Sequence, residues 1–358
     1  MLRSLVIAAA LLPFVASAAT LQSDHYRRLN IELVDAQVVP GYGRLADSAA
    51  ALHARAARYC SDEASLDEVR EAWGTAFDAW QGVQHLRFGP IELFMRGMRM
   101  QFWPDPRNSV GGTLDEVLAK AGPALLEEGG FDELTVPAQG FPAIEYLIHG
   151  DALTPGGYAC GLLRTIAGGI ADMAADTLET WVGGDKSWRE GIAHAGDGKL
   201  HYQNDQEVTQ DFFKAMHGAL ELVAEHKLVR PLGASLETAK PKLAESWRSG
   251  RSLDNIRVNL AAAEAMYLGR VEDGGFSRVV REVAGDAKLD DLLRRAFKQT
   301  RGTADSIEMP LSRAIVDPTE RAKLAKLARE ASALKALLAQ RLTAALGIPL
   351  GFNSMDGD

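Results

Sequence analysis

The sequence predicts an all-α protein made of two packed helical bundles. Apolar residues recur at spacings of three and four through most of the chain, as on the buried face of an amphipathic helix. No convincing run of alternating polar and apolar residues is present, so we expect almost no β-strand. A chain of 358 residues is long enough for two hydrophobic cores. We place the boundary in a polar, glycine-containing region, which gives halves at 19–195 and 196–358.

The helices of the first half follow from this periodicity and from the positions of proline. Residues 24–39 and 42–58 form two helices or one kinked helix, because Pro40-Gly41 interrupts the pattern. Two prolines in the stretch 101–107 forbid a helix there and predict an ordered loop. The other elements are expected as helices at 66–87, from 90 onward, at 114–121 and at 157–182, with a surface loop at 127–132.

The second half shows the same apolar stripes. Ser252 is expected to cap one helix, because a serine hydroxyl can accept a hydrogen bond from an unpaired amide of the first turn. The final helix carries leucine and alanine at heptad-like spacing, which is typical of helix packing. The helices are expected at 208–230, 252–268, 286–302 and 318–346.

The N-terminal residues predict an exported protein. Arg3 is followed by an apolar run at 5–15 and by Ala16-Ser17-Ala18, a pattern typical of a cleaved signal peptide at residues 1–18. The run is too short for a permanent anchor, and no cysteine follows it to carry a lipid. We therefore expect a periplasmic protein without a transmembrane segment in the mature chain.

Cys60 and Cys160 are the two cysteines of the chain. An even count in an exported protein favours a disulfide bond between them. Two buried free thiols are the alternative.

The charge balance limits the classes of partner. Lys and Arg number 39 against 48 Asp and Glu, for a net charge of −9, and no basic cluster is present. This argues against binding to nucleic acid or to an anionic membrane, and it mildly favours cationic ligands.

The stretch 139–150 combines a turn, a helix start and an acidic residue among apolar neighbours. Pro142 suits the first helical position, because its missing N–H is not needed there, and Gly140 lets the chain turn in. Glu145 then ends the first turn, where the unpaired amides favour a carboxylate. Gly150 closes the short helix.

This stretch resembles the signature of the imelysin-like family of exported proteins, which includes the insulin-cleaving membrane protease and iron-regulated periplasmic proteins. The family motif Gly-x-His-x-x-Glu is matched at Gly140 and Glu145, but Pro142 replaces the histidine and cannot coordinate a metal. Weaker landmarks extend the resemblance over nearly the whole mature chain: Ala72-Trp73, Trp80, Phe88-Gly89-Pro90, Trp103-Pro104, Glu245-Ser246-Trp247-Arg248-Ser249-Gly250 and residues 346–358.

The resemblance implies an all-helical fold of two bundle-like halves, with the motif facing a cleft between them. It also strengthens the expectation of a Cys60–Cys160 disulfide, because family members carry cysteines in comparable places. The expected link to iron comes from the resemblance as well.

Three residues are candidates for binding a metal or another ligand. Glu145 is the first, because a buried carboxylate must find a partner or lose its charge. Glu92 and His149 could approach the same cation, although a solvated acid and a helix-end histidine are their structural interpretations. His217 and Glu221 also have the spacing of a ligand pair, but we expect an exposed stabilising pair.

The expected cleft walls come from two stretches. Trp103, Asp105 and Arg107 lie on the proline-fixed loop, and Phe141 and Tyr146 lie beside the acid of the motif. Asp105 and Arg107 could instead pair with each other, a contact worth less than about 1 kcal/mol at a surface.

We expect a non-catalytic periplasmic binding protein associated with iron or another divalent or trivalent cation, because carboxylate-rich sites favour hard cations. Other iron-handling proteins of the cell envelope are the expected partners. One alternative is a metal-free cleft for a peptide, a small ligand or a partner protein. The other is a metallopeptidase, which would need three metal ligands and an open position for water. His-Glu-x-x-His, Gly-x-Ser-x-Gly, phosphate-loop and dinucleotide motifs are absent from the sequence.

Overall fold

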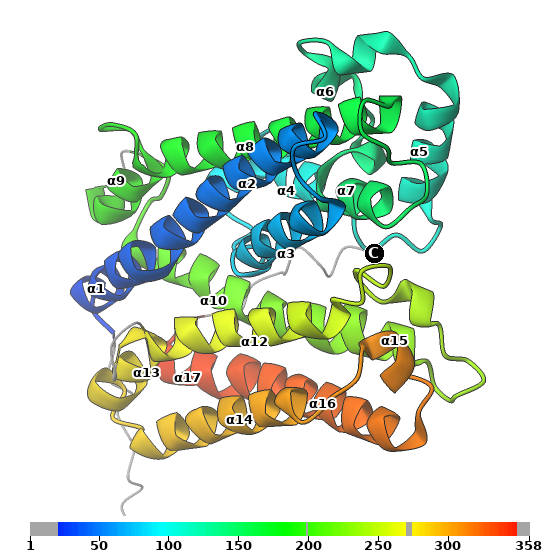
Figure 1. The fold of residues 1–358 in the computed structure, drawn as a ribbon. Coiled ribbons are helices and arrows are strands. Elements are labelled where there is room, and N and C mark those ends of the chain that lie inside the picture. Colours follow the sequence, from blue (N-terminus) through cyan, green and yellow to red (C-terminus); the bar gives the residue numbers. More distant parts are fainter. Residues whose placement is uncertain (1–20, 198–199, 270–273, 349–358) are drawn as a thin grey trace, which may run out of the picture.

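The structure, a computed structural model, describes residues 21–197, 200–269 and 274–348, and over these residues the chain forms helices and loops without a β-strand. The helices form two packed groups, one from each half of the chain (Figure 1). The all-α fold of two helical bundles is therefore confirmed. The predicted signal peptide at 1–18 lies outside the described residues. Among the described helices, none is both long and apolar enough to cross a membrane.

The first half is built around α2 (Val39–Cys60), which packs against α3 (Leu66–Gln81) and α8 (Tyr158–Val182) (Figure 1). Ser65 begins α3 with a capping box, in which its hydroxyl and the Glu68 carboxylate each accept a hydrogen bond from the other residue's N–H. The shorter elements of this half are η2 (Gly89–Met95), α4 (Arg96–Met100), α5 (Ser109–Lys120), η3 (Pro123–Leu126), α6 (Gly130–Glu133), η4 (Val136–Ala138), α7 (Gly140–Ile148), α9 (Trp188–Ala193) and η5 (Ala195–Asp197).

Pro40 does not interrupt the first helix. α1 (Ser23–Leu33) continues into α2 through the π-helical segment η1 (Val34–Val38), just before the proline. The wider turn accommodates a residue that has no N–H to donate and a bulky ring. Because α1 also packs on α10 (Asp205–Glu221) and α13 (Gly275–Arg278), this continuous helix connects both halves.

The second half is a bundle in which α10 packs against α12 (Ser252–Leu268) and α16 (Pro318–Leu337) (Figure 1). α14 (Ala287–Asp305) packs against both α12 and α16 and closes the bundle. The shorter elements are η6 (Leu222–Val229), α11 (Arg230–Leu232), η7 (Pro241–Leu243), η8 (Val279–Val283), α15 (Leu311–Ala314), η9 (Leu338–Leu342) and α17 (Thr343–Leu346).

Three local expectations are wrong. α3 ends at Gln81 rather than near residue 87, and the region 127–132 contains the start of α6. Ser252 is not a cap but the first residue of α12, since its hydroxyl donates to the carbonyl oxygen of Glu245. The side chain thus holds the preceding segment rather than the first turn of its own helix.

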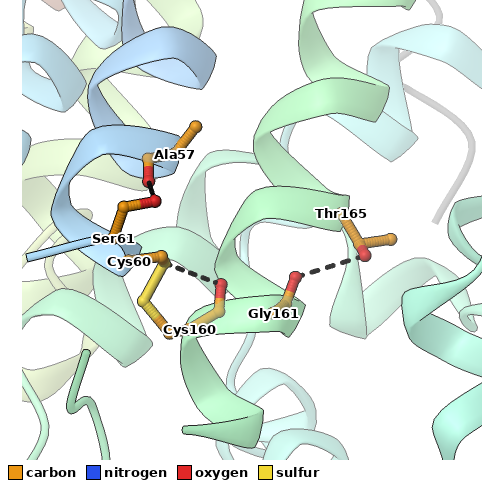
Figure 2. The surroundings of a disulfide bond; sticks show 6 residues. All are labelled: Ala57, Cys60, Ser61, Cys160, Gly161 and Thr165. Atoms are coloured by element: carbon orange, nitrogen blue, oxygen red, sulfur yellow. Dashed lines mark hydrogen bonds between the residues drawn. A yellow bond between two sulfur atoms is a disulfide. The ribbon is translucent and has the colours of Figure 1, made fainter. Parts of the chain in front are cut away.

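The disulfide between Cys60 and Cys160 is present and joins the end of α2 to the start of α8 (Figure 2). The two Cα atoms are 5.6 Å apart, and 100 residues separate them in the sequence. Closing so long a loop restricts the unfolded chain and stabilises the fold by roughly 4 to 5 kcal/mol in the chain-entropy description. The bond therefore ties together the two helices that carry the rest of the first half.

Candidate functional site

A cavity of about 450 Å³ lies between the two halves. The first half contributes side chains from α3, the loop at 101–108, α5 and α7, and the second half contributes side chains from η6, α11 and the segment 242–248. This volume falls in the range of about 300 to 1,000 Å³ that is common for small-molecule sites. Glu145, the acid of the sequence motif, is one of the residues that line it.

α7 is held tightly at the cavity wall and begins two residues earlier than predicted, at Gly140. Gly140 has a φ of +75°, and a Cβ atom there would lie 2.3 Å from the carbonyl oxygen of Met100, so only glycine fits. Pro142 lies in the first turn, where its missing N–H leaves no bond unmade, and it lines the cavity. Trp73 donates from Nε1 to the carbonyl oxygen of Phe141 at 3.1 Å and so ties α7 to α3.

Glu145 belongs to the first half, and its side chain contacts the second half. Its side chain is buried, and Oε1 accepts a hydrogen bond from the backbone N–H of Ser249 at 2.8 Å. Burial raises the pKa of the Glu145 carboxyl, and the nearby charge of Glu245 raises it further, whereas Ser249 and the Arg248 guanidinium oppose the rise. The site thus holds a carboxyl that gives up its proton less readily than an exposed one.

Glu245 is the second buried acid of the cavity, and four side chains donate to it. These are Gln101 at 2.6 Å and Gln81 at 3.2 Å on Oε1, and Lys227 at 2.7 Å and Asn255 at 2.6 Å on Oε2. Gln81 and Gln101 belong to the first half, so this network also joins the two halves.

Lys227 is the cation of this network. Its Nζ donates to Gln81 Oε1 at 2.7 Å and to Asn259 Oδ1 at 2.6 Å in addition to Glu245. Burial lowers the pKa of the ammonium group, and the Glu245 carboxylate opposes that change. These bonds hold the Glu245 side chain in place at the cavity wall.

Aromatic rings and cations form much of the remaining wall. The Arg248 guanidinium lies 5.0 Å from the ring centre of Tyr146 and 4.6 Å from that of Trp247. Lys242 Nζ lies 5.3 Å from the Trp247 ring, and Arg230 also lines the cavity. In this arrangement the aliphatic parts of the cationic side chains pack on the protein, and their charged groups can still interact with a ligand.

The proline-fixed loop contributes only part of its predicted wall. Trp103 lines the cavity, and its peptide bond to Pro104 is cis. Asp105 also lines it, but its two carboxylate oxygens accept from the backbone N–H groups of Ser109 at 2.7 Å and Val110 at 2.9 Å, at the start of α5. Arg107 is exposed and lies outside the lining, so this loop offers no charged pair to a ligand.

Glu92 and His149 do not join Glu145 in the cavity. Glu92 is exposed on η2, and His149 lies at the end of α7 with its ring 6.2 Å from that of Trp73, edge to face. Phe141 is also absent from the lining, because it is buried in the core against Phe77. Tyr146 lines the cavity as predicted and donates to Asp115.

Elsewhere, His217 and Glu221 form a buried pair, with 3.9 Å between Nδ1 and Oε2, so the expectation of an exposed pair is wrong. Within the described part of the chain, no three His, Cys, Asp or Glu side chains are placed to hold a metal ion together.

Sequence reasoning assigned no role to Glu245, Arg248 or Lys227. Glu245 and Arg248 lie in the run Glu245-Ser246-Trp247-Arg248-Ser249-Gly250, and the resemblance of this run to the family is the available signal. Lys227 carries no local signal, because a lysine on a helix is usually exposed.

Comparison with known proteins agrees with this architecture. The structure of an imelysin-like protein from Psychrobacter arcticum superposes with a TM-score of 0.73 at 19% identity, covering 94% of this chain and 99% of the other. A candidate iron-regulated protein A precursor from Parabacteroides distasonis gives a TM-score of 0.73 at 16% identity, covering 90% and 96%. At these identities the likeness concerns the fold.

Sequence relatives point the same way. The chain is 26% identical over 245 residues to iron-regulated protein A of Synechococcus elongatus, a match that covers 67% of this chain and 64% of that protein, slightly less than two thirds of its length. A family model described as imelysin matches residues 38–340. The chain therefore belongs to the imelysin family.

Proposed function

We propose that the protein is a non-catalytic binding protein whose ligand occupies the cavity between the two halves, and that it serves the handling of iron or another metal outside the cytoplasm. The observation that carries the proposal is the shared cavity, with Glu145 of the first half reaching the backbone of Ser249 in the second. The name of the Synechococcus relative supports the link to iron, and the N-terminal sequence supports export.

The carboxylates of the cavity are poor candidates for coordinating a bare cation. Both oxygens of Asp105 accept backbone N–H groups, and both oxygens of Glu245 accept side-chain donors. Oε1 of Glu145 already accepts the backbone N–H of Ser249, and Glu92 and His149 lie elsewhere. A hard cation in a protein takes several oxygen ligands. The donor set therefore favours iron that arrives already bound to a small molecule.

The same donor set speaks against the metallopeptidase alternative. A catalytic zinc site needs three protein ligands and an open position, and Pro142 stands where the family motif has its nitrogen ligand. Binding without peptide hydrolysis is the simpler use of this cavity.

Iron retention by purified mature protein tests the proposal. We expect the protein to keep iron through gel filtration after incubation with ferric citrate. Leu243→Trp, which adds a ring at the cavity wall, should abolish retention. Leu236→Trp, at an exposed position outside the lining, is the matched control and should retain iron like the parent. Equal retention by both variants would refute the cavity as the site. Chelator-sensitive peptide hydrolysis would refute the non-catalytic assignment.

A further inference from the structure

We infer that the cavity recognises an organic anion with an aromatic ring. This inference rests on the proposed function for its site but concerns the chemistry of the ligand. It starts from the charges that face the cavity.

Three cationic side chains line the cavity. Arg230, Lys242 and Arg248 all belong to the second half, and within the described residues none of them lies in a salt bridge. Among the described residues, the side chain of Arg248 forms one hydrogen bond, to the neutral amide oxygen of Asn108 at 3.1 Å. Its guanidinium can therefore still offer N–H groups to a carboxylate in the bidentate geometry that arginine favours.

The carboxylates of the cavity do not neutralise the charges of Arg230, Lys242 and Arg248. Glu245 is neutralised by Lys227 at 2.7 Å, and the charge of Asp105 is taken up by the start of α5. Burial raises the pKa of Glu145, which weakens its repulsion of an anion. The overall charge of −9 predicts a preference for cations, but the local charges of this wall favour the opposite sign.

The rings of the cavity select for a flat body. Trp103 and Phe102 come from the loop of the first half, and Trp247 comes from the second, with Tyr146 beside it. Rings of this kind stack on aromatic ligands, and ring pairs contribute about 0.5 to 1.5 kcal/mol beyond the area they bury. A carboxylate facing Arg248 and a ring among these side chains would use both features of the wall.

Three probes with one ring and different charges test the inference without iron. Benzoate, benzamide and benzylammonium are titrated against the mature protein, and binding is followed by tryptophan fluorescence and by ligand-observed NMR. Ligands this small reach only millimolar Kd values in most sites. We expect benzoate to bind at least fivefold more tightly than benzamide, and benzylammonium to bind most weakly.

Variants that remove one positive charge identify the side chain that binds the carboxylate of benzoate. Arg248→Gln should weaken benzoate at least fivefold and leave benzamide nearly unchanged. Arg295→Gln, which removes the same charge from an exposed position on α14, is the matched control and should change benzoate less than twofold. Should Arg248→Gln fail to fold, the double variant of the exposed residues, Arg230→Gln with Lys242→Gln, provides the same test.

The outcomes separate this inference from the proposed function. Three results would each overturn the inference even if the protein retains iron from ferric citrate. They are a failure of benzoate to bind, equal binding of benzoate and benzamide, and unchanged benzoate affinity in the Arg248 variant. Benzoate selectivity without iron retention supports the inference and overturns the link to iron instead.

Discussion

Glu145 and Glu245 line the same cavity from opposite halves, and they differ in how their charge is treated. Glu245 accepts from four side chains, one of them the ammonium group of Lys227. Glu145 accepts the backbone N–H of Ser249, and the Arg248 guanidinium opposes the rise of its pKa without a salt bridge to it among the described residues. Burial alone therefore does not define the role of an acid; its partners do.

The partners of each carboxylate indicate which acid is structural and which can respond to a ligand. A buried carboxylate in a complete network of donors is fixed, because any movement would leave several groups without partners. A buried carboxyl with few partners can change its protonation or its contacts at small cost. We therefore propose that Glu245 belongs to the framework of the cavity and that Glu145 can contact a ligand.

The largest expected effect is the loss of stability in Glu245→Gln. The substitution keeps the shape of the side chain but leaves the Lys227 ammonium buried without an anion, which typically costs about 3 to 5 kcal/mol. Guanidinium unfolding followed by circular dichroism measures the change. Adding Lys227→Met should recover much of it, because the uncompensated charge is then removed. A loss below about 1 kcal/mol would show that the network is not the framework.

A smaller loss of stability is expected when a substitution shifts α7, the helix that carries Glu145. Gly140→Ala places a Cβ 2.3 Å from the Met100 carbonyl oxygen at a φ of +75°, so the start of α7 must shift at a cost of about 2 kcal/mol or more. Gly43→Ala is the control, because nothing lies within 4 Å of its added Cβ, and it should stabilise α2 by up to about 1 kcal/mol. Thermal unfolding compares the two variants. Similar melting temperatures would mean that the contact at Gly140 is easily relieved.

The sequence predicts the fold well because apolar spacing is a local property that each helix carries by itself. The start of the short helix is visible from Gly140 and Pro142 in the same way. The prediction that Glu145 ends its first turn is wrong, because α7 begins at Gly140 and Glu145 lies in the second turn. The partners of an acid are not local: the bond between Lys227 and Gln81 joins residues 146 positions apart. The sequence also offers Glu92 as a residue that could approach the same cation as Glu145, yet spacing along a helix does not say whether Glu92 faces the cavity or solvent, and in the structure it is exposed.

The smallest expected effect is a pH-dependent change in stability at Glu145, which distinguishes this residue from Glu245. Because the pKa of Glu145 is raised in the fold, its stabilising contribution is fully present below the ordinary value of 4.5 and is lost as pH rises through the folded-state pKa. Glu145→Gln removes the cost of keeping an ionised carboxylate buried, while the new amide oxygen can still accept a hydrogen bond from Ser249. The variant should therefore gain stability relative to the parent at pH 8, within about 1 kcal/mol, and gain nothing at pH 4.

Melting temperatures of Glu145→Gln and the parent at the two pH values provide the measurement. A variant that is destabilised at pH 8 but not at pH 4 would reverse the sign and show that the charged form of Glu145 is the favoured one in the fold. In that case Arg248 would be committed to Glu145 as Lys227 is to Glu245, and the cavity would present one cation fewer to an anionic ligand.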